Sequence, residues 1–164
     1  MPIVPFDSLP DDARVWVFGA DRPLDAAEAT RLLGVVDAHL ARWAAHGTAL
    51  ASARDWRDDR FLTIAVDQRT TGASGCSIDA LFHQLQQLER ALAVSIVGGG
   101  RIFWRDTTGA VQSTDRPTFS DLAADGTVTP ATAVFDPTVT TLGTWRTAFE
   151  RRASDSWHAD LLIP

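Results

Sequence analysis

Two short segments of the chain carry apolar side chains on both of their alternating faces, and this restricts the folds that the chain can adopt. Residues 14–20 have the sequence RVWVFGA, and residues 61–66 have the sequence FLTIAV. Because successive side chains of a strand point to opposite faces, each segment is predicted to be a strand buried on both sides. A sheet that contains these strands therefore needs a cover on each face.

Two amphipathic helices are also predicted. Asp25, followed three residues later by Glu28, is an aspartate form of the capping box, and apolar residues at helical spacing continue to about His46. A second helix is predicted to begin after an N-cap at Ser77, with apolar residues at helical spacing as far as Leu92.

The remaining strands complete a known order of elements. Residues 50–56 are predicted to form an outer strand that pairs with 61–66 through a turn, and residues 101–105 form a strand after the glycines at 98–100. The order strand, helix, strand, strand, helix, strand predicts an α+β protein with a ferredoxin-like core. Such a core has a four-stranded antiparallel sheet, with the first and third strands in the middle, and two helices.

The C-terminal third of the chain is expected to be an extension of this core. We expect residues 1–106 to form the ferredoxin-like core and residues 107–164 to form an α/β extension packed on it. Two helices cover only one face of the core sheet, so the extension or a second copy of the chain must cover the other. A homodimer that forms through an open sheet face or strand edge is therefore an expected assembly.

Charge and composition exclude several classes of protein. The net charge is -6 and the arginines are scattered, so nucleic acid is not an expected partner. The apolar stretches are far shorter than the roughly 20 residues of a membrane-spanning helix, so no membrane span is expected. The chain has a single cysteine, Cys76, and its first ten residues lack the pattern of a secretory signal. We therefore expect a cytoplasmic protein with a reduced thiol.

Three runs of the sequence carry a resemblance to a known group of proteins. The runs PFDSLPDDARVWVFGADRPL (5–24), WAAHG (43–47) and SGCSID (74–79) resemble a family of small, uncharacterised bacterial proteins. Members of this family are sometimes labelled ABC transporter ATPases, and the resemblance implies that label. A phosphate-binding loop of the type GxxxxGK[ST] needs a lysine, however, and all 15 basic residues of this chain are arginine. The sequence thus excludes a P-loop ATPase.

The C-terminal segment carries a second resemblance. The pattern FWRDTTG, then FSDLAADGTVTPATAVF, then Trp145 resembles GYF-like adaptor modules and covers about a quarter of the chain. The resemblance implies a strand, helix, strand order and the binding of proline-rich peptides. The region that carries the Gly-Pro-Phe/Tyr signature in that class contains Arg116, Pro117 and Phe119 here.

Cys76 is the strongest candidate for chemistry in the sequence. A thiol at a helix N-terminus lies in a positive field that favours the thiolate. Asp79 and His83 lie one turn apart on the polar side of the same predicted helix, so the three residues could act as nucleophile, orienting carboxylate and base. Cys76 and His83 are about 10 Å apart along the helix axis, however, and Asp79 opposes ionisation of the thiol. The favoured alternative is a small buried thiol beside a solvent-facing Asp79–His83 pair.

Residues around this helix start are the candidate ligand contacts. Backbone amides near Ser77 could bind an anion, so Ser74, Gly75 and Ser77 are expected contacts, with His46 as a further contact or an alternative base. His39 and His46 are seven residues apart, whereas a helical pair of metal ligands is usually four apart, so neither a metal site nor a cofactor is expected.

Taken together, these features favour a non-catalytic binding or protein-interaction module. No complete catalytic or metal-binding constellation satisfies the geometry that such sites need. Two alternatives stay open: a thiol-dependent enzyme that uses Cys76, and an adaptor that binds proline-rich peptides through its C-terminal segment.

Overall fold

The computed structural model describes residues 3–45, 48–69 and 75–162 and has an α+β fold. Its strands are β1 (Arg14–Gly19), β2 (Ala44–Ala45), β3 (Thr48–Ala49), β4 (Ser52–Arg57), β5 (Phe61–Val66), β6 (Ile102–Arg105), β7 (Val111–Thr114), β8 (Ala133–Phe135) and β9 (Glu150–Arg152). Its α-helices are α1 (Ala26–Ala41), α2 (Gly75–Leu92), α3 (Arg116–Ala124) and α4 (Leu142–Ala148). Three short 3-10 helices are η1 (Phe6–Ser8), η2 (Ala153–Asp155) and η3 (Trp157–Leu161).

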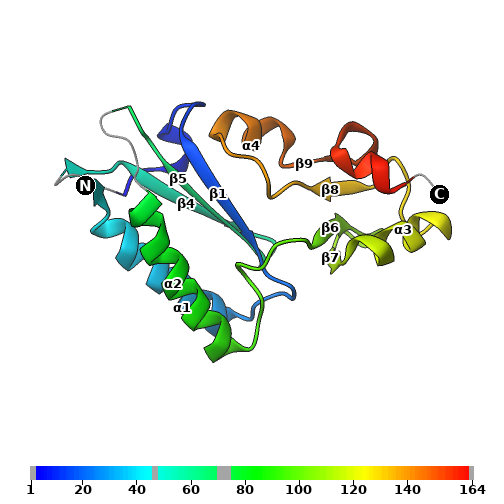
Figure 1. Cartoon of the computed structure of the whole chain (residues 1–164), viewed down its shortest axis with the longest axis horizontal. Coiled ribbons are helices and arrows are strands. Elements are labelled where there is room, and N and C mark those ends of the chain that lie inside the picture. Colours follow the sequence, from blue (N-terminus) through cyan, green and yellow to red (C-terminus); the bar gives the residue numbers. More distant parts are fainter. Residues whose placement is uncertain (1–2, 46–47, 70–74, 163–164) are drawn as a thin grey trace.

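Two antiparallel sheets organise these elements (Figure 1). The first sheet has the order β1-β5-β4, the second has the order β7-β6-β8-β9, and β2 and β3 form a separate short pair. Because β1 and β4 are each antiparallel to β5, they are parallel to each other, and α1 connects them. This is the split βαβ unit that the element order predicts. The outer position expected for residues 50–56 is confirmed, since β4 lies at the edge of the sheet.

The four-stranded ferredoxin-like sheet is not confirmed. The strand expected to complete it, β6, pairs with β7 and β8 in the second sheet, although we expected it within a core of residues 1–106. As a result β1 is an edge strand and not a central one. The ring of Phe103 explains the position of β6: it packs so closely on Gly19 that a Cβ atom there would lie 2.5 Å from the ring.

The first helix begins as predicted and ends earlier. Glu28 N–H donates to Asp25 Oδ1 at 2.8 Å, and Asp25 N–H donates to Glu28 Oε1 at 3.0 Å, which confirms the capping box. We expected this helix to continue to about His46, but α1 ends at Ala41. Its last turn tightens, because Arg42 N–H donates to the carbonyl of His39 at 3.2 Å, so the chain leaves the helix axis.

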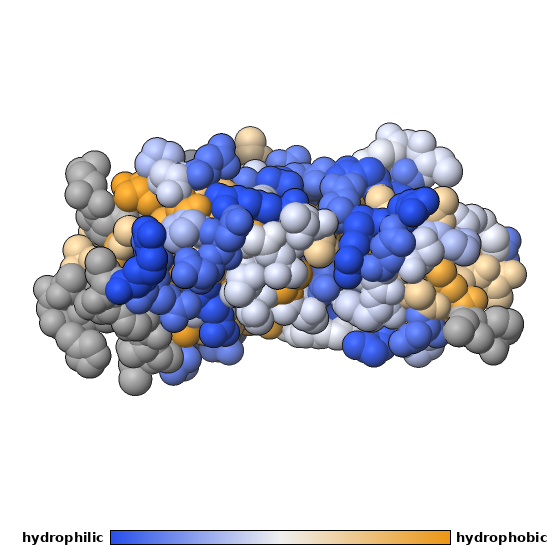
Figure 2. All heavy atoms as spheres, turned by 90° about the horizontal axis from the view of Figure 1, so that it is seen from above, coloured by the Kyte–Doolittle hydropathy of each residue, from blue (hydrophilic) through white to orange (hydrophobic). Residues whose placement is uncertain are grey.

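The central strand β5 is covered on both faces, as its sequence predicts. Leu62 and Ile64 pack against α1 and α2 on one face, whereas Phe61 and Ala65 pack on the other face against the C-terminal part of the same chain. On that second face, Trp145 Nε1–H donates to the buried hydroxyl of Thr63 at 3.0 Å. The C-terminal third therefore supplies the cover that the sheet requires. Seen from above, the molecule is mostly hydrophilic, with apolar side chains confined to limited patches (Figure 2).

Four phenylalanine rings join the two sheets. The ring of Phe61 lies 5.0 Å from Phe103, 4.7 Å from Phe135 and 5.2 Å from Phe149, measured between centroids. Such tilted and edge-to-face arrangements are favourable for aromatic pairs. Gly19 lies directly against this group through its contact with the Phe103 ring. The close approach of the Phe103 ring to β1 therefore depends on a residue without a side chain.

Replacing Gly19 tests this packing. We expect Gly19→Ala to lower the free energy of unfolding by about 1–3 kcal/mol, because the added methyl group forces the Phe103 ring out of its position. Gly34→Ala is the matched control, since Gly34 lies in α1 with nothing near its Cβ position and should gain roughly 0.5–1 kcal/mol from helix propensity. Urea denaturation measures both effects, and equal stability of Gly19→Ala and the wild type would contradict the packing argument.

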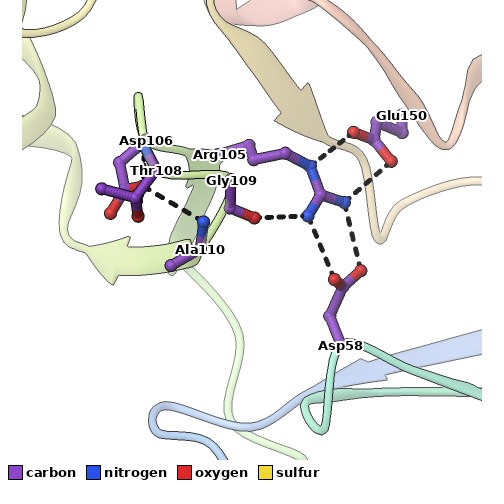
Figure 3. Close-up of polar contacts among 7 residues, drawn as sticks. All are labelled: Asp58, Arg105, Asp106, Thr108, Gly109, Ala110 and Glu150. Carbon is purple, nitrogen blue, oxygen red and sulfur yellow. Dashed lines mark hydrogen bonds and ion pairs between the residues drawn. The ribbon is translucent and has the colours of Figure 1, made fainter.

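An arginine also ties the two sheets together at the ends of their strands (Figure 3). Arg105 on β6 donates to both carboxylate oxygens of Asp58, at 3.1 and 3.2 Å, and of Glu150, at 2.9 and 3.1 Å. It also donates to the carbonyl of Gly109 at 2.8 Å. Hydrogen bonds to Glu150 and Asp58 raise the pKa of Arg105 above its ordinary value. The β4–β5 turn, which contains Asp58, is thereby fixed to β6 and β9.

Loss of this arginine should weaken the junction of the two sheets. We expect Arg105→Gln to lower the free energy of unfolding by about 1–2 kcal/mol at low salt, with a smaller loss at 1 M salt, because two charge-assisted bidentate contacts disappear. Arg152→Gln removes a more exposed pair with Asp155 and should cost less than about 0.5 kcal/mol. Thermal and urea denaturation compare the free energies of unfolding of the two variants. Equal losses in the two variants would mean that the Arg105 contacts add nothing beyond an ordinary surface pair.

Candidate functional site

A groove of about 330 Å³ runs along the free edge of β1, where a fourth strand of the first sheet would lie. We call it the β1 groove. Its floor is the strand itself, and its sides come from Phe82 on α2, from residues 96–101, from Phe103 on β6 and from residues 137–140. Its volume lies at the lower end of the range of small-ligand sites, roughly 300–1,000 Å³.

The edge of β1 presents unpaired backbone groups to this groove. Val15 N–H donates to the carbonyl of Thr140 at 3.0 Å, on the side away from β5, whereas Ala20 N–H donates toward the β5 side, to Arg60. Because the backbone groups of a strand alternate in direction, Val17 and Gly19 also face away from β5. Within the described part of the chain, neither N–H group makes a hydrogen bond across this edge.

The sides of the β1 groove are mainly apolar. Phe82 and Ile96 lie on the side of the two helices, and Phe103 and Val139 lie on the side of the second sheet. Glu89 holds residues 96 and 97 in place, since its Oε1 accepts hydrogen bonds from both of their N–H groups at 2.5 Å. An apolar ligand segment would thus meet apolar contacts on both sides.

The charged side chains that line the described part of the groove are both arginines. The guanidinium of Arg14 lies 5.0 Å from the centroid of the Trp16 ring, at the start of β1. Arg101 donates to Ser113 Oγ at 3.0 Å and lies 3.8 Å from Asp21 Oδ2, beyond the end of β1. The chain as a whole carries a charge of -6, so this groove has the opposite sign to the average surface.

Glycines form the rim beside Arg101. Residues 98–100 are all glycine, and Gly100 has a φ of +85°, a conformation that side chains disfavour. The sequence alone predicts these glycines only as a break before a strand. The structure places them beside the β1 edge, so the glycine run followed by Arg101 was the signal in the sequence that pointed to this site.

The residues that the sequence singled out lie elsewhere or are outside the described chain. Asp79 and His83 are exposed on α2, and neither lines the β1 groove. We expected Ser77 to cap α2, but the helix begins at Gly75, so Cys76 and Ser77 belong to its first turn. The side chains of Cys76 and Ser77 are outside what the structure describes. Ser74 and His46 are also outside the described residues.

The described residues contain no group of three or more His, Cys, Asp or Glu side chains able to hold a metal ion. Within residues 3–45, 48–69 and 75–162, no helix combines the length and the apolar character that a membrane span needs.

A buried serine and histidine form a second pair that the sequence did not indicate. Ser156 Oγ and His158 Nδ1 are 2.7 Å apart, and the His158 ring stacks on Trp157 with centroids 3.8 Å apart. His158 is fully buried, and burial lowers its pKa to about 4. A serine hydrogen-bonded to a histidine can act as a nucleophile and its general base. Neither residue lines the β1 groove, however. The pair instead belongs to the packing around Phe119.

The burial of His158 predicts how stability depends on pH. In the unfolded chain His158 binds a proton near pH 6.5, whereas in the native state it does so only near pH 4. The free energy of unfolding should therefore fall as the pH drops through this window, by at most about 3 kcal/mol. His158→Gln should remove this part of the pH dependence, whereas His83→Gln, at an exposed position, should keep it. Urea denaturation from pH 7 to 4 measures the difference. A histidine NMR titration with His158 protonating near pH 6.5 would contradict the burial argument.

No protein-family model, curated protein or solved structure matches this chain.

Proposed function

We propose that this protein is a non-catalytic binding module and that its ligand occupies the β1 groove. The observation that carries the proposal is the free edge of β1 between two apolar sides, with Arg14 and Arg101 at its two ends. A concave, largely apolar site with a few polar groups in fixed positions is typical of ligand binding. The expected cytoplasmic location and a protein or peptide partner belong to the same proposal.

The polar side chains of the groove favour binding over catalysis. Besides the two arginines, the polar side chains that line its described part are those of Thr138 and Thr140. Arginine stays protonated at neutral pH and threonine has no acidic or basic group in this range, so these side chains hold anions and donate hydrogen bonds. General acid or base work needs a group that titrates near the working pH.

The adaptor hypothesis for the C-terminal segment has one supporting observation and one against it. The segment has the order β6, β7, α3, β8, which contains the strand, helix, strand order that the GYF-like resemblance implies. Trp104 is only 7% exposed, however, and its ring packs edge-to-face on Phe119 with centroids 5.8 Å apart. An aromatic ring covered in this way offers little surface for proline rings to stack on. We therefore prefer the β1 groove to the C-terminal segment as the ligand site.

The thiol-enzyme hypothesis stays separate from the groove. It requires Cys76 to act with His83 or His46 as the base, and the structure shows Asp79 and His83 exposed on α2. No part of the proposed function depends on these residues.

Octanoate, which combines an apolar chain with a carboxylate, tests the proposed function. We expect it to shift the backbone amide NMR signals of residues 15–19 and 98–103, because its chain enters the groove and its carboxylate meets Arg101. Arg101→Gln should weaken its affinity by about tenfold through loss of a charge-assisted contact, and Arg151→Gln, at an exposed position outside the groove, should not change it. Shifts confined to other parts of the molecule, or equal effects of the two variants, would overturn the proposal.

A further inference from the structure

The β1 groove has the geometry of a missing strand, and this identifies the class of its natural occupant. Building on the proposed function, we propose that the groove takes an extended peptide segment, which adds to the first sheet as its fourth strand. The segment has an apolar centre and an acidic side chain at each end. Backbone hydrogen bonding, the length of the free edge, the two apolar sides and the positions of the arginines each support this occupant.

Backbone groups give the first argument. Residues 140–142 pair with residues 13–15 at the start of β1, since Leu142 N–H donates to the Ala13 carbonyl and Val15 N–H donates to the Thr140 carbonyl. Beyond that point the N–H and carbonyl groups of Val17 and Gly19 face the groove. An exposed row of donors and acceptors of this kind is the feature that strand addition uses.

The free edge has a defined length. At one end Thr140 occupies the position opposite Val15 and accepts its hydrogen bond. At the other end Asp21 N–H donates to the carbonyl of Ser95 at 3.0 Å. A strand rises about 3.3 Å per residue, so the stretch from Val15 to Asp21 spans roughly 20 Å. An extended segment of about five residues fits between these two closed ends.

The two sides of the groove set the character of the central residues. Successive side chains of an added strand would point alternately toward the helices and toward the second sheet. They would meet Phe82 and Ile96 on the first side and Phe103 and Val139 on the second. Because both sides are apolar, the central residues of the occupant should be apolar at every position and not only at alternate ones.

The arginines set the character of the ends. Arg14 lies at the first residue of β1, and Arg101 lies beyond the last, next to Asp21. Arg14 is exposed, and the side chain of Arg101 is 38% exposed, so both guanidinium groups can reach a ligand. An acidic side chain at each end of the added segment would pair with them.

The same charges disfavour a second copy of this chain as the occupant. If the β1 edges of two copies paired antiparallel, the Arg14 end of each strand would meet the Arg101 end of the other. Like charges opposite each other across paired strands destabilise the pairing. The homodimer expected from an open strand edge is therefore an outcome that the test must detect, and not the preferred one.

The test uses a set of acetylated and amidated pentapeptides. Each has glutamate at both ends and a combination of Val, Ile and Leu at the three central positions, and a matching set has glutamine at both ends. Affinity for the full chain is measured by isothermal titration calorimetry, and amide hydrogen exchange is followed by NMR. We expect the best glutamate peptides to bind at least tenfold more tightly than their glutamine counterparts and to slow exchange at Val17 and Gly19 at least tenfold.

Two variants distinguish strand addition from simple occupation of the groove. Val17→Pro removes an N–H group that faces the groove and not β5, so the sheet should stay intact while peptide affinity falls at least tenfold. Val17→Ala keeps the N–H group and is the matched control for the lost side chain. Far-ultraviolet circular dichroism and thermal denaturation check that both variants are folded. If Val17→Pro does not fold, the hydrogen-exchange result on the wild type decides the matter.

The outcomes separate this inference from the proposed function. Peptide binding without slowed exchange at Val17 and Gly19, equal binding of the glutamate and glutamine sets, or equal binding to Val17→Pro and Val17→Ala would overturn strand addition. If octanoate binds in the groove and no peptide does, this inference fails and the proposed function stands. If neither ligand perturbs the groove amides, both fail. A dimer in sedimentation that Val17→Pro disrupts, with no peptide bound to the wild type, would show that the β1 edge takes a second copy of the chain and would overturn this inference.

Discussion

The contact between Phe61 and the phenylalanines of the second sheet determines where the rest of the chain can lie. Phe61 is fully buried on the face of β5 that points away from the helices, and the rings of Phe103, Phe135 and Phe149 surround it. Burying a side chain of this size stabilises a protein by roughly 1.5–3 kcal/mol. The strand that carries Phe103, β6, pairs with β7 and β8 in the second sheet and meets Phe61 through this ring, so it does not complete the first sheet beside β1.

This constraint leaves a free edge inside an otherwise well-covered sheet. Proteins usually protect such edges with charged residues, bulges or a covering segment, because an open edge can pair with any extended chain. Here residues 137–140 and 96–101 cover the two ends, and Arg14 and Arg101 add charge. The edge between them is recessed between Phe82 and Phe103 and so admits a narrow segment more readily than another sheet. The packing of the second sheet on Phe61 therefore leaves the edge of β1 free and places Phe103 on one side of the β1 groove.

The local elements could be predicted from sequence, whereas the pairing of the last core strand could not. The two-faced apolar character of residues 61–66 and the capping box at Asp25 are set by neighbouring residues, and both are present in the structure. The sequence IFWR has the same local character whether it pairs with β1 or with β7, so its partner depends on contacts distant in sequence. The β1 groove was missed for a related reason: much of it is backbone, whereas Cys76, Asp79 and His83 attracted attention through side-chain chemistry.

The net charge of the chain and the lining of the β1 groove together restrict which ligands bind there. A chain with a charge of -6 repels an acidic partner at long range, and only the short-range fields of Arg14 and Arg101 oppose that repulsion. A purely acidic segment would gain little from the apolar sides, and a purely apolar segment would have nothing to fix its register along β1. A segment that combines both features satisfies the backbone groups, the apolar sides and the arginines at once. Specificity in such a site therefore comes from requiring all three contacts in one short stretch of chain.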